Sequence, residues 1–195
     1  KSSKRIYRTV DLILNTSEIQ IGSYEINPTK FKLYPDIIEY AAQEIIEEAK
    51  SKNLYFTIKS KYDLIWIKAD FHSTFNIFYH LFDNAVKYTE TGGVTVIIDK
   101  ISYNKAKVSV IDTGVGISES YIQKLFTPFS QEQEGYTRKF DGVGLGLSLV
   151  KSYCDFNDFE ISITSQKGRG TTIEIIITNI IEAIEIEDFH ISDLI

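Results

Sequence analysis

The sequence contains almost no sulfur: its 195 residues include one cysteine and no methionine. Cys154 cannot form an internal disulfide, and its neighbours offer no metal-ligand spacing, so we interpret it as a buried thiol in a reducing compartment. Because the chain begins at Lys1 and lacks methionine altogether, we expect it to be a piece of a longer protein.

Long apolar runs and an excess of positive charge are also missing. No window approaches ~18 uninterrupted apolar residues, and no signal-peptide core follows residues 1–8. Acidic residues outnumber basic ones by 27 to 21, and the net charge of -6 argues against a nucleic acid partner. With 43% hydrophobic residues, the chain is expected to be soluble, folded and cytoplasmic, which leaves a membrane anchor elsewhere in a parent protein open.

Hydrophobic periodicity predicts interspersed helices and strands. Helical spacing favours helices at 6–21, 37–49, 70–88 and 147–156, and β-rich runs favour strands at 54–58, 64–67, 94–98, 107–111, 159–164 and 171–178. The runs 54–58 and 64–67 are interpreted as a hairpin. Since βαβ alternation is irregular, we predict an α+β fold: a two-layer α/β sandwich with a mixed β-sheet packed against about three helices.

Two segments fall outside this regular pattern. The polar, glycine-bearing stretch 112–146 is much longer than a usual connection and is interpreted as a flexible lid. The tail 179–195 contains acidic residues but no Lys or Arg. Its isoleucines are compatible with an added strand or with docking on a partner, but we expect a frayed end.

The helix predicted over 70–88 has a core face and a chemical face. Phenylalanines gather on one side, whereas His80, Asn84 and Lys87 lie within about 60° of one another on the other. Asn84 offers a carbonyl oxygen suited to Mg²⁺, and Lys87 offers a mobile charge that phosphates accept. Taken alone, however, the same residues are more typical of an ordinary helix face in water.

Two glycine clusters add to this pattern. Asp112 opens the sequence DTGVGI at the end of an apolar strand, where an Asp can accept a hydrogen bond from an exocyclic amine such as that of adenine, although a plain turn fits as well. The sequence GVGLGL at 142–147 opens a helix, so that free N–H groups form an anion site in outline. No strand leads into it, which excludes a dinucleotide fingerprint.

In their order and spacing, these segments resemble the N, G1, F, G2 and G3 boxes of the ATP-binding catalytic domain of sensor histidine kinases. That domain belongs to a superfamily shared with gyrase B and heat-shock chaperone ATPases. The matching segments are HLFDNAVKY at 80–88, DTGVG at 112–116, FTPF at 126–129, GVGLGL at 142–147 and GRGTT at 168–172. The resemblance covers about residues 24–178 and implies the same fold.

The resemblance implies a role for each matched residue. Asn84 would be the Mg²⁺ ligand, Lys87 a phosphate contact and Tyr88 a wall against the adenine, which Asp112 would read. Lys124 stands where the family often has an Arg near the γ-phosphate, so Asn84, Lys87 and Lys124 are the expected catalytic residues. The residues expected to bind Mg-ATP are His80, Asn84, Lys87, Tyr88, Asp112, Gly114, Gly116, Ile117, Phe126, Gly142, Gly144, Leu145, Gly146 and Thr171.

Five positions differ from the family pattern, and two of them are Ser73 and Thr74, which stand where the family often has Arg and Leu. His80 occupies a position that is commonly Asn, and Val143 replaces a frequent Thr. Lys124 lacks the bidentate fork that an Arg would offer.

The resemblance also implies partners. Residues 1–23 resemble the end of a dimerisation and phosphotransfer helix with its linker, before a catalytic domain at 24–178 and an acidic tail at 179–195. None of His72, His80 and His190 lies in an acceptor-like context. The implied reaction therefore transfers the γ-phosphoryl group of ATP to a histidine on a dimerisation domain missing from this chain, then to a response regulator receiver domain, in a homodimeric full-length protein.

Two alternatives remain on the same scaffold. The first is a degenerate, non-catalytic nucleotide-binding or partner-docking module. The second is a serine kinase or an ATPase. The gyrase and chaperone branches place a catalytic carboxylate where His80 stands, and its absence disfavours stand-alone ATP hydrolysis.

Overall fold

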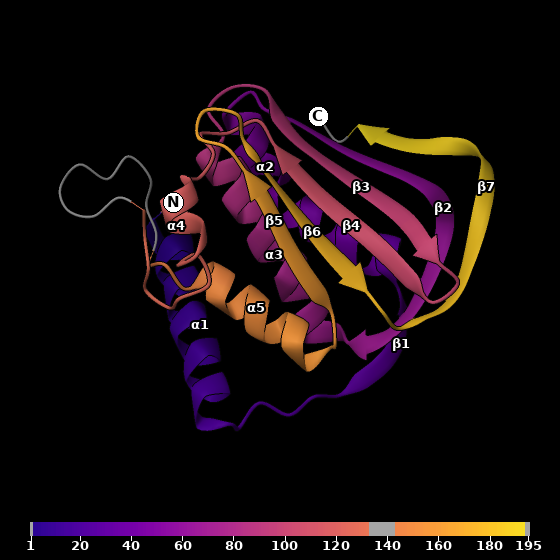
Figure 1. Ribbon diagram of the computed structural model, residues 1–195, viewed down its shortest axis with the longest axis horizontal. Coiled ribbons are helices and arrows are strands. Elements are labelled where there is room, and N and C mark those ends of the chain that lie inside the picture. The colour runs from indigo at the N-terminus through magenta and orange to yellow at the C-terminus, as the bar shows by residue number, and fades with distance from the viewer. Residues whose placement is uncertain (1, 133–142, 194–195) are drawn as a thin grey trace.

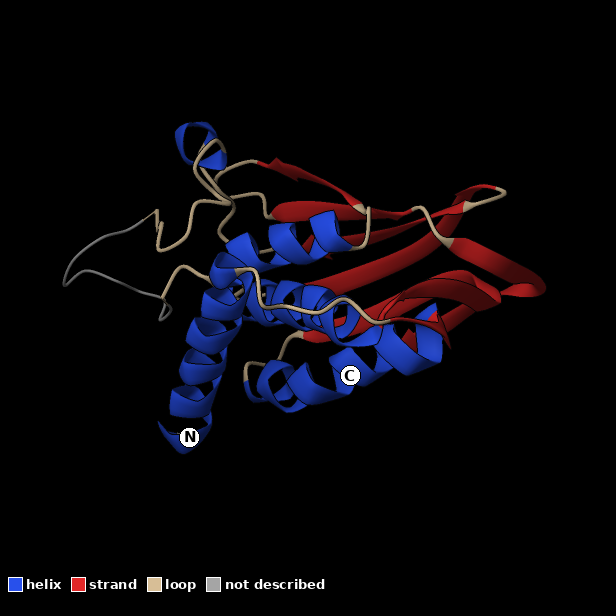
Figure 2. Ribbon diagram, turned by 90° about the horizontal axis from the view of Figure 1, so that it is seen from below, coloured by secondary structure: helices blue, strands red, loops and turns tan. Residues whose placement is uncertain are grey.

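The computed structural model describes residues 2–132 and 143–193, which form one mixed β-sheet with helices gathered on one face (Figures 1 and 2). The helices are α1 (Ser2–Ile21), the π-helix η1 (Leu33–Glu39), α2 (Tyr40–Ser51), α3 (Phe71–Tyr88), α4 (Glu119–Ile122) and α5 (Gly146–Phe156). The strands are β1 (Pro28–Lys32), β2 (Tyr55–Asp70), β3 (Gly93–Ser102), β4 (Lys105–Asp112), β5 (Glu160–Ser165), β6 (Thr171–Ile177) and β7 (Ile180–Asp193).

The sheet has the strand order β1-β2-β3-β4-β6-β5, and β7 pairs with β2 off this path. The pairing of β2 with β3 is parallel, whereas every other pairing in the described chain is antiparallel. One face packs on α2, α3 and α5, whose buried residues form a single core with those of the strands. The predicted α+β sandwich with a mixed sheet is therefore confirmed.

Aromatic packing fixes α3 against the sheet. Phe78 and Phe82 are fully buried, and Phe82 meets Phe56 of β2 edge-on with ring centroids 5.3 Å apart. Phe71, in contrast, is 39% exposed and lies at the first turn, where it packs edge-on against Phe31. The buried face of α3 thus begins at Ser73 and not at Phe71, where the sequence pattern placed its start.

The predicted hairpin at 54–67 is wrong, because β2 continues as one strand from Tyr55 to Asp70. Its first half pairs with β3 and its second half with β1, so neither half needs the other as a partner. The polar residues between the two halves continue the strand with local irregularities. Ser60 Oγ donates to the Tyr62 carbonyl at 2.8 Å and accepts from the Tyr62 N–H at 3.0 Å, which marks a bulge rather than a turn.

The expected frayed tail is also wrong. Residues 180–193 form β7, which pairs antiparallel with β2, and Ile180 and Ala183 pack against the core. A long strand without this neighbour would leave a row of backbone N–H and C=O groups unpaired, and β7 satisfies them. The tail therefore extends the sheet.

The described part of the chain contains no helix that combines the length and the apolar character needed to cross a membrane.

Candidate nucleotide site

The predicted site residues meet where α3 ends, where β4 ends and where α5 begins. The loop after β4 is joined to α3 by a hydrogen bond from the Val115 N–H to the Tyr88 carbonyl at 3.1 Å. Helix α5 approaches α3 at Gly146, where an added Cβ would lie 3.7 Å from Asn84 Nδ2. Three segments that are distant in the sequence therefore surround one region of the surface.

Asp112, the last residue of β4, is held in one orientation. Its Oδ1 accepts hydrogen bonds from the N–H groups of Gly114 at 2.8 Å and Thr171 at 3.2 Å. Both bonds go to Oδ1, and no residue in the described ranges donates to Oδ2. Burial raises the pKa of this carboxyl more than the two N–H donors lower it. A fixed, desolvated carboxylate with an available oxygen is suited to accept a hydrogen bond from a ligand amine.

Close backbone contacts explain two of the glycines beside Asp112. An added Cβ on Gly114 would lie 2.5 Å from the Tyr88 carbonyl oxygen and 2.8 Å from Asp112 Oδ1. Gly116 has φ +62°, and an added Cβ would lie 2.0 Å from the Gln166 carbonyl oxygen. Both positions require glycine, because no side chain fits between these backbone segments.

A hydroxyl cluster holds the other wall of the site. Ser165 Oγ lies 2.9 Å from Thr171 Oγ1, donates to the Gly170 carbonyl at 2.9 Å, and accepts from the Ile117 N–H at 2.9 Å. The sequence analysis named Ile117 and Thr171 but missed Ser165. Nothing in the local sequence separates Ser165 from any other serine at the end of a strand.

The chemical face of α3 is half-buried rather than fully exposed to water. His80, Asn84 and Lys87 are all partly exposed, and His80 packs its ring against Tyr79 with centroids 5.3 Å apart. Lys87 Nζ lies 4.7 Å from the centroid of the Tyr88 ring, a cation–π distance. Lys87 and Tyr88 therefore act as one unit at the end of α3.

The start of α5 has the geometry of an anion site. The helix has no side-chain cap, so its first N–H groups stay available to a ligand. Just before it, Gly144 has φ +76°, its carbonyl accepts from the Phe129 N–H at 2.9 Å, and Leu145 is fully buried. These contacts fix the helix start. Gly142 lies outside the described residues.

The segment between Asp112 and α5 is only partly described, and the lid prediction falls in part on residues 133–142, outside the described ranges. At its described edge, Glu132 accepts from the Ser118 N–H at 3.0 Å and from Lys167 Nζ at 2.7 Å. Burial alone would raise the pKa of Glu132, but these donors lower it. The segment is thereby tied to the turn between β5 and β6.

Lys124 and Phe126 are less closely connected to the rest of the site. Phe126 is half-buried, and Lys124 is exposed. Within the described ranges, no hydrogen bond or ion pair joins the Lys124 ammonium to another site residue. Its role near a γ-phosphate stays a prediction.

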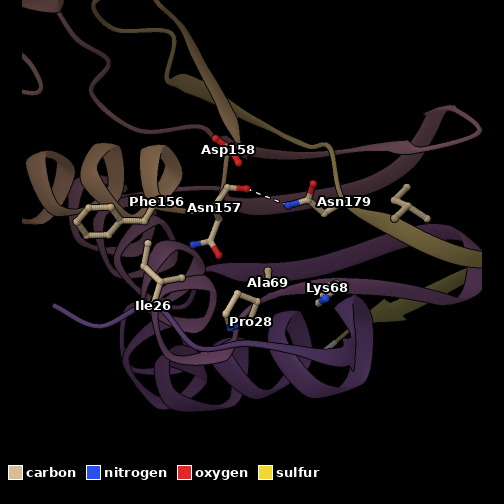
Figure 3. Close-up of a pocket in the computed structure, with 9 residues that line it drawn as sticks. Ile26, Pro28, Lys68, Ala69, Phe156, Asn157, Asp158 and Asn179 are labelled. Atoms are coloured by element: carbon tan, nitrogen blue, oxygen red, sulfur yellow. Dashed lines mark hydrogen bonds between the residues drawn. The ribbon is translucent and has the colours of Figure 1, made fainter.

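A separate cavity of about 410 Å³ lies at the opposite end of α3 and α5, and it includes none of the predicted site residues. Figure 3 shows it between the linker that follows α1 and the end of α5. Its lining residues are Ile26, Pro28, Lys68, Ala69, Phe156, Asn157, Asp158, Asn179 and Ile180.

The comparison with known families decides the family of this chain. Residues 69–179 match the sequence profile described as "Histidine kinase-, DNA gyrase B-, and HSP90-like ATPase". The chain belongs to this family. The match includes α3, Asp112 and the start of α5, the segments that surround the candidate site of this ATPase-family domain.

Curated relatives of the domain include sensor kinases. An uncharacterized sensor-like histidine kinase of Rhizobium meliloti is 33% identical over 177 residues, which cover 91% of this chain and 34% of the relative. The autoinducer 2 sensor kinase/phosphatase LuxQ of Vibrio parahaemolyticus is 30% identical over 177 residues, covering 88% of this chain and 20% of LuxQ. The domain therefore spans 34% of the first relative and 20% of the second.

Solved structures share the fold. Full-length ShkA in complex with AMPPNP matches with a TM-score of 0.80 and 22% identity, covering 93% of this chain and 37% of ShkA. The catalytic domain of histidine kinase ThkA matches with a TM-score of 0.66 and 25% identity, covering 78% of this chain and 98% of that domain. The architecture is thus that of histidine kinase catalytic domains.

Proposed function

We propose that this chain is the ATP-binding catalytic domain of a two-component sensor histidine kinase. The observation that carries the proposal is the convergence of Asn84 and Lys87 on α3, the desolvated Asp112 after β4, and the uncapped start of α5. The family match and the sensor kinases among its relatives support it.

In this proposal, Asp112 and Tyr88 bind the adenine. Asp112 accepts a hydrogen bond from the exocyclic amine through the oxygen that no described N–H occupies. The Tyr88 ring, 37% exposed, provides an apolar wall for the base. Gly114 and Gly116 let the loop approach the base without side chains in the way.

The phosphates lie toward Lys87 and the start of α5. The Lys87 ammonium is a mobile point charge. The N–H groups from Gly144 to Gly146 lie at the start of α5, which is the positive end of its helix dipole. Leu145 is fully buried and anchors this turn in the core. Lys124 is proposed to approach the γ-phosphate only in the assembled, nucleotide-bound protein.

The residues present fit a Mg²⁺ ion that is held largely by the nucleotide. In the part of the chain that is described, no group of three or more His, Cys, Asp or Glu is placed to hold a metal ion. Mg²⁺ commonly takes few protein ligands when phosphates and water supply the others. Asn84 is half-buried beside Gly146, whose missing side chain leaves room near the amide. Mg²⁺, when bound, would neutralise charge on the phosphate oxygens.

The proposed reaction is phosphoryl transfer to a histidine outside this chain. A ring nitrogen of that histidine forms a bond to the γ-phosphorus, the bond from the γ-phosphorus to its bridging oxygen breaks, and ADP leaves with the electron pair. Residues 1–23 would belong to the dimerisation helix and linker. We further propose a cytoplasmic location, a homodimeric full-length protein and a response regulator receiver domain as the next acceptor.

Calorimetric titration with ATP, with and without Mg²⁺, tests the proposal on the chain as it is. We expect the wild-type chain to bind ATP and the Asp112→Asn variant to bind at least about tenfold more weakly, since it loses a charged acceptor. No ATP binding by the wild-type chain, or equal affinity in the variant, would refute the nucleotide site and leave a partner-docking module.

Transfer itself is tested on a longer parent protein that includes the dimerisation domain. Incubation with radiolabelled ATP is expected to give a phosphoprotein that is labile in acid, as phosphohistidine is. An acid-stable product would instead favour a serine kinase on the same scaffold.

A further inference from the structure

Lys52, the residue directly after α2, connects α2 to the end of α3. Its Nζ lies 2.7 Å from the carbonyl oxygen of Val86, 2.9 Å from that of Lys87 and 3.4 Å from that of Thr89. An ammonium group has three protons to donate, so these three carbonyls use all of them. The contact joins segments more than thirty residues apart in the sequence.

These bonds satisfy the end of the helix that carries the proposed phosphate contact. The last four carbonyl groups of a helix have no partner within the helix. In α3, the Ala85 carbonyl accepts from Thr89 Oγ1 at 2.7 Å, and Lys52 serves the next two, those of Val86 and Lys87. Lys52 is therefore bonded directly to the backbone of Lys87.

The last carbonyl of α3, that of Tyr88, connects the end of the helix to the loop that follows Asp112. The Tyr88 carbonyl accepts from the Val115 N–H at 3.1 Å, and Gly114 lies so close that an added Cβ would be 2.5 Å from that oxygen. The end of α3 is thus held from two sides, by Lys52 from α2 and by the loop that follows Asp112. Loss of either contact changes where Lys87 lies relative to Asp112.

The charge of Lys52 suits this position. A cation is stabilised at the negative, C-terminal end of a helix dipole. Burial lowers the pKa of Lys52 most, and the nearby charge of Lys87 lowers it further, whereas Glu48, Glu90 and Asp83 raise it.

We infer that Lys52 is a positioning residue of the nucleotide site, which holds the last turn of α3 so that Lys87 faces the phosphates of ATP. This inference rests on the proposed ATP binding. Lys52 does not touch the nucleotide itself, and it acts through Lys87.

The test compares Lys52→Met with the matched variant Lys50→Met. Methionine keeps an unbranched side chain only one atom shorter than lysine but cannot donate, so three carbonyls lose their partner. Lys50 lies at the same end of α2 but is exposed and only pairs with Glu47 at 3.3 Å. By calorimetry, we expect ATP affinity to fall about tenfold in Lys52→Met, the scale of a lost charged hydrogen bond, and to stay within about twofold in Lys50→Met.

A double-mutant cycle separates positioning from general stability. If Lys52 acts through Lys87, the Lys52→Met change has less than about a twofold effect on ATP affinity in the Lys87→Met background. A loss in Lys52→Met that persists at full size in that background overturns the inference, as does wild-type affinity in Lys52→Met. If Lys52→Met does not fold, Lys52→Arg decides: an Arg keeps the charge but not the compact ammonium, so we expect about threefold weaker ATP binding that vanishes in the Lys87→Met background.

The two proposals fail in different ways. If Asp112→Asn loses ATP and Lys52→Met does not, only the role of Lys52 is refuted. If the wild-type chain does not bind ATP, the proposed function itself is refuted.

Discussion

The hydroxyl of Tyr24 donates a hydrogen bond to Asp70 Oδ1 over 2.8 Å and so joins the linker after α1 to the start of α3. The same oxygen accepts from the Ser73 N–H at 2.8 Å, which makes Asp70 the N-cap of α3. Asp70 Oδ2 accepts from the Asn27 N–H at 3.0 Å, and the Tyr24 ring stacks on Phe156 of α5 with centroids 5.3 Å apart. The buried Asp70 carboxylate thus joins the linker to α3, and the Tyr24 ring joins the linker to α5.

Replacing Asp70 by Ala is expected to destabilise the domain by about 2 kcal/mol. The variant loses a helix cap and leaves buried donors without their acceptor. Urea denaturation measures the loss. The control is Asp155→Ala, in an exposed pair with Lys151, which should cost no more than about 0.5 kcal/mol. Equal losses in the two variants would contradict a special role for Asp70.

The same carboxylate predicts a loss of stability in acid. Burial alone would raise the pKa of Asp70, but hydrogen bonds from Ser73, Asn27 and Tyr24 outweigh it and lower the pKa below 3.8. A lowered folded-state pKa contributes stability at pH values above the unfolded pKa, and this stability is lost as pH falls through the lowered value.

We therefore expect the free energy of unfolding to decrease more steeply below about pH 4 in the wild-type chain than in Asp70→Asn. Denaturation curves at pH 7 and pH 3 measure both slopes. Parallel pH profiles would show that Asp70 does not carry this dependence.

Sequence patterns correctly predicted the elements whose signals lie within their own segment. The helix predicted at 70–88 is found as Phe71–Tyr88, because its apolar spacing and its capping Asp70 are both local signals. The hairpin at 54–67 was not found, since the partners of β2 are β1, β3 and β7, all distant in sequence. The isoleucines of the tail allowed an added strand, but the pairing of β7 with β2 could not be predicted, because the tail gives no sign of which strand edge it covers.

In the candidate site, too, residues with a local sequence signal could be predicted, and residues that act through distant partners could not. Asp112 and its glycines were predictable, since a strand end followed by glycines is visible in one short segment. Lys52 and Ser165 were not, because a lysine at a helix end and a serine at a strand end are typical of any surface. Only the fold places Lys52 at the carbonyls of α3 and Ser165 beside Ile117.

Gly116→Ala and Gly168→Ala form a matched pair of backbone tests. Both glycines have positive φ, +62° and +78°, so both substitutions incur about 1 kcal/mol of conformational cost. At Gly168 nothing lies within 4 Å of the added Cβ, whereas at Gly116 the Cβ would lie 2.0 Å from the Gln166 carbonyl oxygen. We expect Gly116→Ala to lose at least about 2 kcal/mol and most ATP affinity, and Gly168→Ala to lose about 1 kcal/mol and no affinity. Similar behaviour of both variants in denaturation and calorimetry would argue against the tight contact.

Asp112 is expected to bind ATP at a cost to the stability of the empty domain. Burial raises the pKa of Asp112 above 3.8, more than the N–H donors of Gly114 and Thr171 lower it. A carboxyl whose folded-state pKa is raised contributes stability to the folded domain below its unfolded pKa, and this contribution is lost as pH rises through the folded-state pKa. At pH 7 the charged carboxylate therefore destabilises the empty domain.

In Asp112→Asn the amide oxygen still accepts from both N–H groups, but the charge is gone. We therefore expect the free energy of unfolding at pH 7 to be equal or higher while ATP affinity falls at least about tenfold, measured by urea denaturation and calorimetry. A variant that loses stability together with affinity would identify Asp112 as a structural residue instead, because opposite changes are what a ligand-binding carboxylate produces.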